Sequence, residues 1–576
     1  TPPMNPSSSP RHRRTTAMGV LGALILAHAV VRLPAQPPPS GEVVSLPPLM
    51  VEETGNPLVW RYLATPTQEI VSVCDDDTIL AFAKRYHRLE ELLEEIVPAR
   101  FLARKSAPEA NVIFNEKFGR ARSQEVIAEM LQRSPGKAGP AGSRLTGQSG
   151  GQPRIRFLPN MRIADSDLIA VFSIFEGTAV AASRFVFAEE RIAALLQDRV
   201  PRLPDWFVVG TVRLFHQTTF NDDEIAIGPA GWTSPEETAA LKNDPGRPRA
   251  LLPIEEMFAY RPTPAGSAPT ETDRRWSAQC ALFVRWAVAE NKGARREIFW
   301  KWVDRLEKEP LTEATFRDCF GMGFSDARDR LSDYLPLAVN GHLSLKTPKS
   351  VPLRGLKVRL ATDGEVARIR GGWERLEIAY VRKQFPAVVD KYIEQARKTL
   401  HRAYDRNDRD PRLLTELGLT EIEAGDAATA REFLEAAVQA DTPRPSAYYQ
   451  LALLRFNALP PGALKLTVAQ SEEVLAPLLA GRRFDPPLLE SYLLMSDVLR
   501  LRAEPPTPAQ LTFLNQGTLL FAHLPSLVGR AVSFNFAAGQ TATALELIDA
   551  GQRAAREPAL HERYQRLREE LTALKK

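Results

Sequence analysis

Short stretches with β-branched and aromatic residues come first along the chain, and longer stretches with helical periodicity follow. Residues 60–72 have the composition typical of a strand or hairpin arm. Residues 76–98 place apolar side chains at helical spacing, and Asp76 or Asp77 can cap that helix. Further strands are expected at 111–115, 154–158 and 167–174, and further helices at 183–198, 206–216, 273–290 and 294–307. The block 56–342 is therefore expected to hold a small mixed sheet followed by a helical lobe.

A different pattern begins after this block. We expect a linker over 343–370 and continuous helices over 371–576. Apolar and small residues recur there about every 34 residues, the period of tetratricopeptide repeats (TPR), which place small residues where two helices touch. The matching positions are Leu414, Leu417, Gly418, Ala430, Leu434 and Ala437, with Ala396, Leu400 and Ala403 one period earlier and Tyr448, Leu451 and Ala452 one period later. The pattern favours TPR-like repeats, and the alternative is an unrelated helical bundle with this spacing by chance.

Both patterns together predict an α+β fold, in which a small mixed sheet and a helical lobe are followed by an all-α, TPR-like solenoid. The charges are nearly balanced, with 74 Lys and Arg against 70 Asp and Glu, so we expect no nucleic-acid partner. Through the repeats we expect a protein or peptide partner. Only three cysteines are present, which leaves open whether any two form a disulfide: Cys74, Cys280 and Cys319.

The first residues have the pattern of an export signal. A basic cluster that ends with Arg13 and Arg14 precedes a short apolar stretch over 17–31, and small residues follow before a proline tract. We therefore expect a secretion signal over 1–36, a Pro-rich spacer over 37–55, and a periplasmic or extracellular protein. An uncleaved signal anchor is the alternative, and it is the one membrane contact that we expect.

The stretch 184–216, RFVFAEERIAALLQDRVPRLPDWFVVGTVRLFH, is the most informative part of the sequence. It sets an apolar helical segment before a segment, beginning at Pro204, that opens the next helix. This order resembles the active-site region of gluzincin-type (thermolysin-like, "MA-like") metallopeptidases, which often carry helical repeats. In that family an HExxH motif and a downstream Glu supply the zinc ligands and the general base. The resemblance covers about 60–335 and implies a zincin-like fold.

The ligand positions of that family carry other residues here. The first His position is Glu189, the second is Ala193, and the downstream Glu position is Val209. Glu190 alone keeps the residue type of the general base. Because a catalytic zinc site needs three protein ligands, we expect no catalytic residue, no metal and no cofactor. The resemblance also implies that two residues matching the second segment, Trp206 and Gly210, lie on the floor of a cleft that side chains have filled.

Three functions remain open. The first is a non-catalytic, exported pseudopeptidase that binds a peptide or protein and acts as a scaffold. The second is an active metal-dependent hydrolase with an unusual ligand set, drawn from His87, His216 or His342 and carboxylates. The third is an assembly scaffold in which only the repeats matter. We favour the first, because only eight histidines are present and none completes the motif.

Overall fold

The computed structural model describes residues 59–115, 160–175, 189–220, 224–244, 251–263, 268–351, 353–460, 465–555 and 558–574, together with two short strands at 44–46 and 155–157. Residues from Val44 onward form one unit by their contacts. The expected signal over 1–36 and spacer over 37–55 lie outside the described residues, as does 183–188 of an expected helix. Among the described residues, no helix has both the length and the apolar character needed to cross a membrane.

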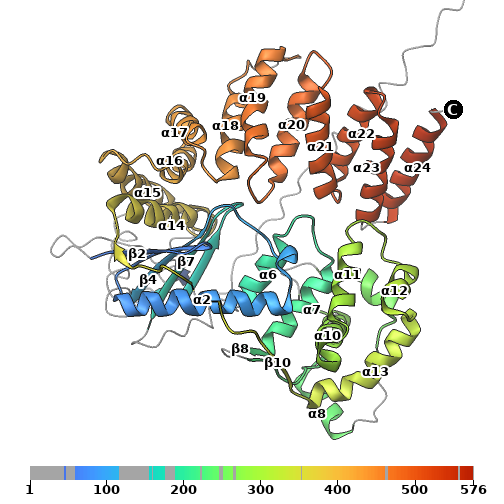
Figure 1. Ribbon diagram of the computed structural model, residues 1–576. Helices are drawn as coiled ribbons and strands as arrows, with labels where there is room; N and C mark the ends of the chain where they lie inside the picture. Colours follow the sequence, from blue (N-terminus) through green and yellow to red (C-terminus); the bar gives the residue numbers. More distant parts are fainter. Residues whose placement is uncertain are drawn as a thin grey trace, which may run out of the picture. The chain divides into compact units, whose positions relative to one another are not determined.

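A six-stranded mixed sheet lies at the centre of the first half (Figure 1). Its three middle strands β3, β4 and β7 run parallel, and the outer strands are antiparallel to their neighbours. The strand order is β11 (Arg359–Leu360), β2 (Arg61–Ala64), β3 (Gln68–Ser72), β4 (Glu109–Asn115), β7 (Ile169–Phe175) and β6 (Asn160–Ala164). The strands expected at 60–72, 111–115 and 167–174 are thus confirmed, and β6 was not predicted.

Helix α2 (Asp76–Ile96) connects the parallel strands β3 and β4 and covers one face of the sheet. Its N-cap is Asp75, whose carboxylate accepts a hydrogen bond from the Thr78 amide, so the expectation of a cap at Asp76 or Asp77 was wrong. Asp75 takes this role because its backbone is still extended, which lets its carboxylate reach the first free amides of the helix.

The two faces of the sheet bury alternate residues against different helices. Ile70 and Ile113 belong to the apolar cluster that α2 completes. Their neighbours Val71 and Val112 belong to a second cluster with Trp373 of helix α14 (Asp363–Gln384). Because side chains alternate along a strand, the sheet is held between α2 and α14, the first helix of the repeats. The repeats are therefore joined to the sheet by an apolar layer.

The helical lobe follows the sheet and has an aromatic core around Trp206, Phe283 and Trp302. The expected helices at 206–216, 273–290 and 294–307 correspond to α7 (Asp205–His216), α10 (Glu271–Ala289) and α11 (Arg296–Arg305). The others are α6 (Glu189–Gln197), α8 (Pro235–Asn243), α9 (Ile254–Ala259), α12 (Glu313–Phe320) and α13 (Phe324–Asn340).

Two smaller sheets complete the strands. One is three-stranded and antiparallel, and it consists of β8 (Thr218–Phe220), β9 (Glu224–Ile227) and β10 (Leu343–Lys346). Strand β10 lies inside the linker expected over 343–370. The other pairs β1 (Val44–Leu46) with β5 (Ile155–Phe157) in parallel. The expected linker therefore contributes strands to two sheets, β10 to the small one and β11 to the central one.

Paired helices fill the rest of the chain. The first of them, α14, begins at Asp363, eight residues before the predicted boundary at 371. They continue with α15 (Val389–Tyr404), α16 (Pro411–Ala424), α17 (Ala427–Gln439), α18 (Pro445–Asn457), α19 (Val468–Gly481), α20 (Leu489–Leu501), α21 (Pro508–Leu520), α22 (Pro525–Ala537), α23 (Thr541–Ala554) and α24 (Pro558–Leu574).

The predicted small positions mark where paired helices touch. A Cβ atom on Gly418 of α16 would lie 2.6 Å from Cγ of Leu434 on α17, a distance that real Cβ contacts do not show. Ala430 and Ala437 of α17 are fully buried. This close packing of consecutive helices is that of a TPR-like solenoid.

Candidate functional site

Helices α6 and α7 carry the positions at which the resembling peptidases hold zinc. Ala193 on α6 and Val209 on α7 are both partly buried and pack against the same apolar cluster of the lobe. Glu189 and Glu190 form the start of α6, and their side chains lie outside what the structure describes. The described part of this region is therefore apolar packing.

Trp206 and Gly210 contribute to the packing of α7. Trp206 is 2% exposed, and its ring centroid lies 5.4 Å from that of Trp302 and 4.9 Å from that of Phe258. A Cβ atom on Gly210 would lie 2.6 Å from the carbonyl oxygen of Cys280 on α10. The glycine is therefore required by the approach of two helices, whatever the chemistry of the site.

The histidines considered as alternative ligands lie on different elements. His87 Nε2 lies 3.1 Å from the carbonyl oxygen of Val351, His216 ends α7, and His342 is exposed beside β10. Within the described ranges, no three His, Cys, Asp or Glu side chains are grouped so that they could hold a metal ion. All three cysteines are free, and burial raises the pKa of the Cys280 thiol.

The densest group of buried charges lies where the sheet meets the repeats, and sequence reasoning missed it. At one end, the Glu69 carboxylate of β3 is 5% exposed. It accepts hydrogen bonds from both terminal nitrogens of Arg368 at 2.8 and 2.6 Å and from Arg412 at 2.8 Å. The Tyr62 hydroxyl donates to it as well, at 2.5 Å. Arg368 and Arg412 come from α14 and α16, so this contact joins the sheet to two repeat helices.

The other end is built on the turn between β6 and β7. Asp165 Oδ1 accepts from the amides of Asp167 and Leu168 at 3.0 and 2.7 Å, which fixes the shape of the turn. Asp165 Oδ2 accepts from Arg375 of α14 at 2.5 Å and from Arg444 at 3.2 Å. Lys105 Nζ donates to the carbonyl oxygens of Asp165 and Ser166 at 3.2 and 2.9 Å.

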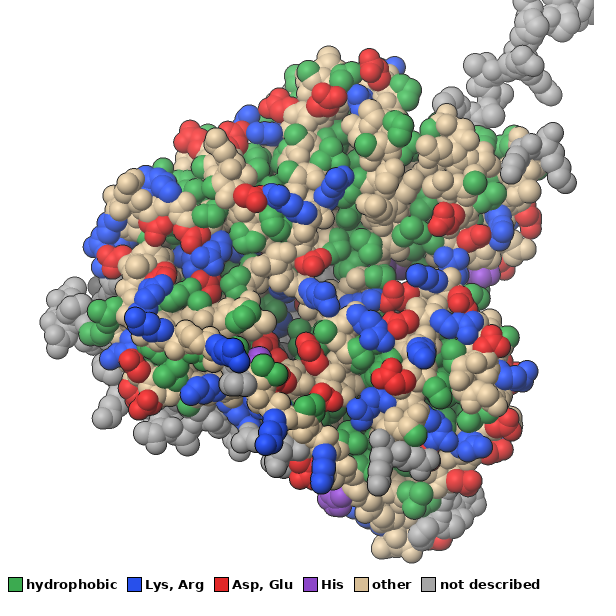
Figure 2. Space-filling view, in the orientation of Figure 1, with side chains coloured by type: hydrophobic (Ala, Val, Ile, Leu, Met, Phe, Trp, Pro, Cys, Tyr) green, Lys and Arg blue, Asp and Glu red, His purple; other side chains and the backbone are tan. Residues whose placement is uncertain are grey.

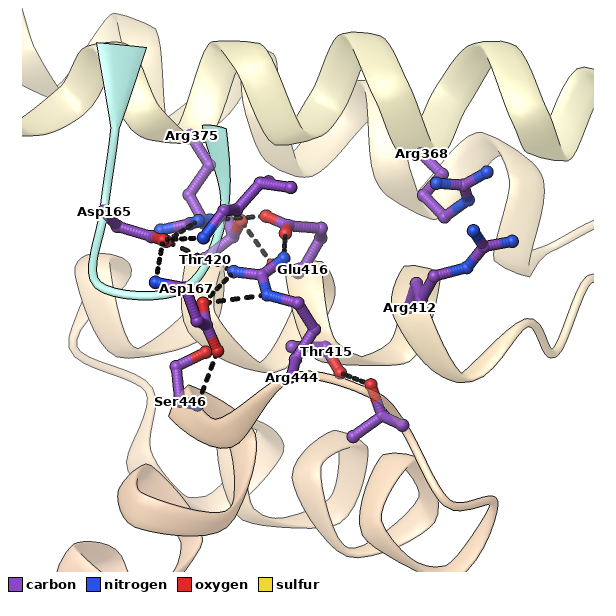
Figure 3. Close-up of polar contacts among 12 residues, drawn as sticks. Asp165, Asp167, Arg368, Arg375, Arg412, Thr415, Glu416, Thr420, Arg444 and Ser446 are labelled. Carbon is purple, nitrogen blue, oxygen red and sulfur yellow. Dashed lines mark hydrogen bonds and ion pairs between the residues drawn. The ribbon is translucent and has the colours of Figure 1, made fainter. Parts of the chain in front are cut away.

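Asp167 is the most deeply buried group of this turn, with no exposed side-chain surface. Its carboxylate accepts from Arg444 Nε at 2.9 Å and from the Ser446 amide, in the first turn of α18, at 2.6 Å. The Arg444 guanidinium also donates to Glu416 of α16, and Glu416 accepts from Arg375 as well. Figure 3 shows Arg375, from α14, beside Asp165, and Arg444, from the residue just before α18, between Asp165, Asp167 and Glu416.

The guanidinium groups set the protonation of most of these acids. Burial alone would raise the pKa of Glu69, but Arg368 and Arg412 hold it below its usual range. Arg444 and Arg375 lower the pKa of Asp165 in the same way, and Arg375 and Arg444 lower that of Glu416. Burial, together with the charge of Asp165, raises the pKa of Asp167. The network is therefore an array of paired charges rather than a set of free acids and bases.

Two cavities adjoin this junction. One, of about 20 Å³, is lined by Glu69, Arg368, Arg412, Glu416 and Arg444 among others, and has room for one water molecule. The other is an open hollow of about 290 Å³ between the 100–104 segment, the α6–α7 loop and Asp485–Pro487. Two arginines that line it, Arg100 and Arg199, are already paired with Asp304 and Glu307. Neither cavity gathers the groups of a catalytic site.

The face of the molecule in Figure 2 shows Lys and Arg side chains interspersed with Asp and Glu. On this face no basic patch of the kind that binds nucleic acids gathers among the described residues.

Comparisons with known proteins add little to this picture. No family model matches the sequence, and no curated protein matches it. Among solved structures, the chain is similar to a thermophilic TPR protein of Thermus thermophilus, at 19% identity and a TM-score of 0.21. The alignment covers 33% of this chain and 97% of that chain. The class is therefore defined by the fold itself: an α+β protein with a small mixed sheet, which ends in a TPR-like helical solenoid.

Proposed function

We propose that this protein is an exported, non-catalytic pseudopeptidase of the gluzincin type, whose TPR-like repeats bind a peptide or protein and act as a scaffold. The observation that carries the proposal is the packing of Ala193 and Val209. Both residues stand where the resembling enzymes have zinc ligands, and both lie against the apolar core of the lobe. Methyl groups cannot coordinate zinc, so these two positions favour a binding role over zinc-dependent catalysis.

Other elements support the comparison with the peptidase fold. The resembling domains often open with a hairpin and a helix, as β2, β3 and α2 do here. They often close with a short helical pair and a Phe-Gly segment. Here Phe316, Phe320 and Gly321 match that segment; the two phenylalanines lie on α12, and Gly321 ends this helix in the left-handed conformation, with φ of 68°. These features support the fold comparison and say nothing about a substrate.

The metal content of the chain from residue 37 onward, purified without a His-tag, tests the catalytic part of this proposal. We expect no bound zinc by elemental mass spectrometry and no chelator-sensitive peptide cleavage. About one zinc per chain together with such cleavage would overturn the proposal, and would favour the hydrolase with an unusual ligand set.

A gain of function tests the alignment itself. The triple variant Glu189→His, Ala193→His, Val209→Glu restores the three ligand types of the family at their positions. If the helices are placed as in that fold, this variant is expected to bind about one zinc per chain. The single variant Ala193→His is the control, because one added imidazole does not complete a site. A folded triple variant without zinc would show that the resemblance is wrong.

Export has its own test. The full chain expressed in a bacterium should be recovered outside the cytoplasm with its first residues removed, close to residue 36, as read by intact mass. Recovery of the uncleaved chain in the membrane fraction would favour the signal anchor instead.

A further inference from the structure

An open hollow lies where the helical lobe meets the repeats, apart from the buried charges of the junction. Its volume is about 290 Å³, near the lower end of the range for sites that bind small ligands. Three segments far apart in the sequence line it: residues 100–104, residues 198–200 between α6 and α7, and Asp485–Pro487 between α19 and α20. The lobe and the repeats therefore both contribute walls to one cavity that is open to solvent.

Hydrogen bonds join the segments that form the hollow. The Ser106 amide donates to the carbonyl oxygen of Asp485 at 2.8 Å, and the Ser106 hydroxyl accepts from the Asp485 amide at 2.7 Å. The Ala103 amide donates to the carbonyl oxygen of Leu195 on α6 at 2.7 Å. Since these bonds already hold the three segments together, the hollow is formed in advance, and a ligand does not have to order its walls.

Two of the three arginines that line the hollow are neutralised by acids at or just after the end of α11. Arg100 donates to both carboxylate oxygens of Asp304 at 2.9 to 3.1 Å. Arg199 pairs with Glu307, and its Nε donates to the carbonyl oxygen of Arg100 at 3.2 Å. These side chains therefore fix one wall and add no net charge to the hollow.

The other charged residues of the hollow have no such partner. Arg104, Asp198 and Asp485 are exposed, and none of them forms an ion pair with another described residue. Arg104 therefore pairs with neither aspartate, although all three line the same cavity. An unpaired cation and two unpaired anions around one hollow suit a ligand that carries both charges, because each charge of the ligand meets a group of the opposite sign.

We propose that this hollow binds a short zwitterionic peptide by its two free ends, with the peptide carboxylate at Arg104 and the peptide amino group at Asp198 and Asp485. A guanidinium matches the geometry of a carboxylate, and carboxylates accept the N–H donors of an ammonium group. Val200 and Pro486–Pro487 supply apolar contact for the rest of the ligand. The inference rests on the proposed peptide-binding role, and it adds the class of peptide and a site that the repeats share with the lobe.

The probe that tests this proposal is trialanine, because its small side chains leave the two charged ends as its main features. Calorimetric titration at low ionic strength, with the full chain from residue 37, should show that trialanine binds. Trialanine with an acetylated amino end, and trialanine with an amidated carboxyl end, should each bind about three- to tenfold more weakly, because each lacks one charged contact.

Variants of the exposed charges assign each end of the peptide to its contact. Arg104→Ala should abolish the difference between trialanine and its amide, and the double variant Asp198→Asn, Asp485→Asn should abolish the difference between trialanine and its acetylated form. The matched control is Arg202→Ala. Arg202 lies in the same loop as Asp198, is 50% exposed and pairs with Asp205, and it does not line the hollow, so all three affinities should stay unchanged.

Three results would overturn the proposal: no binding of trialanine at millimolar concentration, equal binding of the free and capped peptides by wild type, or an Arg104→Ala variant that still distinguishes trialanine from its amide. None of these results depends on the zinc content, which tests the proposed function separately.

Discussion

At Gly210 the helices α7 and α10 approach so closely that a side chain has no room. A Cβ atom there would meet the Cys280 carbonyl at 2.6 Å and Val284 Cγ2 at 2.7 Å. The first of these neighbours is backbone and cannot turn away. We therefore expect Gly210→Ala to lower the free energy of unfolding by about 1–3 kcal/mol, because α7 must shift within a packed aromatic core. Urea unfolding followed by tryptophan fluorescence measures this.

Gly529 provides the matched control for that substitution. It also lies inside a helix, α22, but a Cβ atom there would meet nothing within 4 Å. Gly529→Ala is therefore expected to leave stability unchanged or to raise it by up to about 1 kcal/mol through helix propensity. Equal effects at both positions would mean that the contact at Gly210 is not what makes glycine necessary there.

At the scale of elements, Glu69 links strand β3 to α14 and α16. Removing its charge leaves the buried Arg368 and the partly exposed Arg412 without their shared carboxylate. Glu69→Gln is expected to cost about 3–5 kcal/mol of stability near neutral pH. Because Arg368 and Arg412 lower the pKa of Glu69 in the folded state, this stabilisation is present above its ordinary pKa of 4.5 and is lost as the pH falls.

The pH dependence separates this ion pair from simple packing. The difference in stability between wild type and Glu69→Gln should be full near neutral pH, and it should shrink only as the pH falls below 4.5, because the pKa of the folded-state carboxyl lies below that ordinary value. Urea unfolding at several pH values, followed by circular dichroism, gives the two curves. If the two curves of unfolding free energy against pH ran parallel, the stability lost in Glu69→Gln would come from changed shape and hydrogen bonding rather than from the removed charge.

The elements themselves were largely predictable, because their cores follow local periodicity. The alternation of Ile70 with Val71 and the spacing of small residues such as Gly418 are visible in the sequence. What could not be predicted are contacts between distant segments. Residues 165 and 444 are 279 positions apart, and nothing local indicates that Asp165 meets Arg444. One signal was available: α14 carries arginines and glutamates among its apolar residues, a pattern that a solvated face explains equally well.

In the candidate site, too, local patterns could be predicted from the sequence and contacts between distant segments could not. The absence of the peptidase ligand types at positions 189, 193 and 209 was read from local motif spacing, and it stays a prediction. It did not identify that Gly210 is a helix contact, nor that the turn between β6 and β7 is held by the repeats. That turn was missed because β6 itself was not predicted: Asp165 had no strand to follow, and Asp167 stands first in the strand expected over 167–174.

For the whole molecule, the junction decides whether the sheet and the repeats unfold together. Arg444 meets three carboxylates there, those of Asp165, Asp167 and Glu416. Arg444→Met removes the one cation that touches all three and is expected to cost about 3–5 kcal/mol. Because the contacts that this variant loses join the sheet to the repeats, it should also weaken the coupling between these two halves of the molecule. Tryptophan fluorescence reports mainly on the first half, because seven of the eight tryptophans lie between residues 60 and 302 and the eighth, Trp373, lies on α14 against the sheet, whereas circular dichroism reports on the helices of both halves.

In wild type we expect tryptophan fluorescence and far-ultraviolet circular dichroism to give one coincident transition, and in Arg444→Met we expect two that separate. Arg455→Met is the control: Arg455 is 20% exposed and pairs with Glu435 inside the repeats, so it should cost about 1 kcal/mol or less without separating the signals. Coincident transitions in Arg444→Met would show that the apolar layer between the sheet and α14 suffices to couple the halves. The buried charges would then determine where the repeats dock on the sheet, and the apolar layer would determine how stable that docking is.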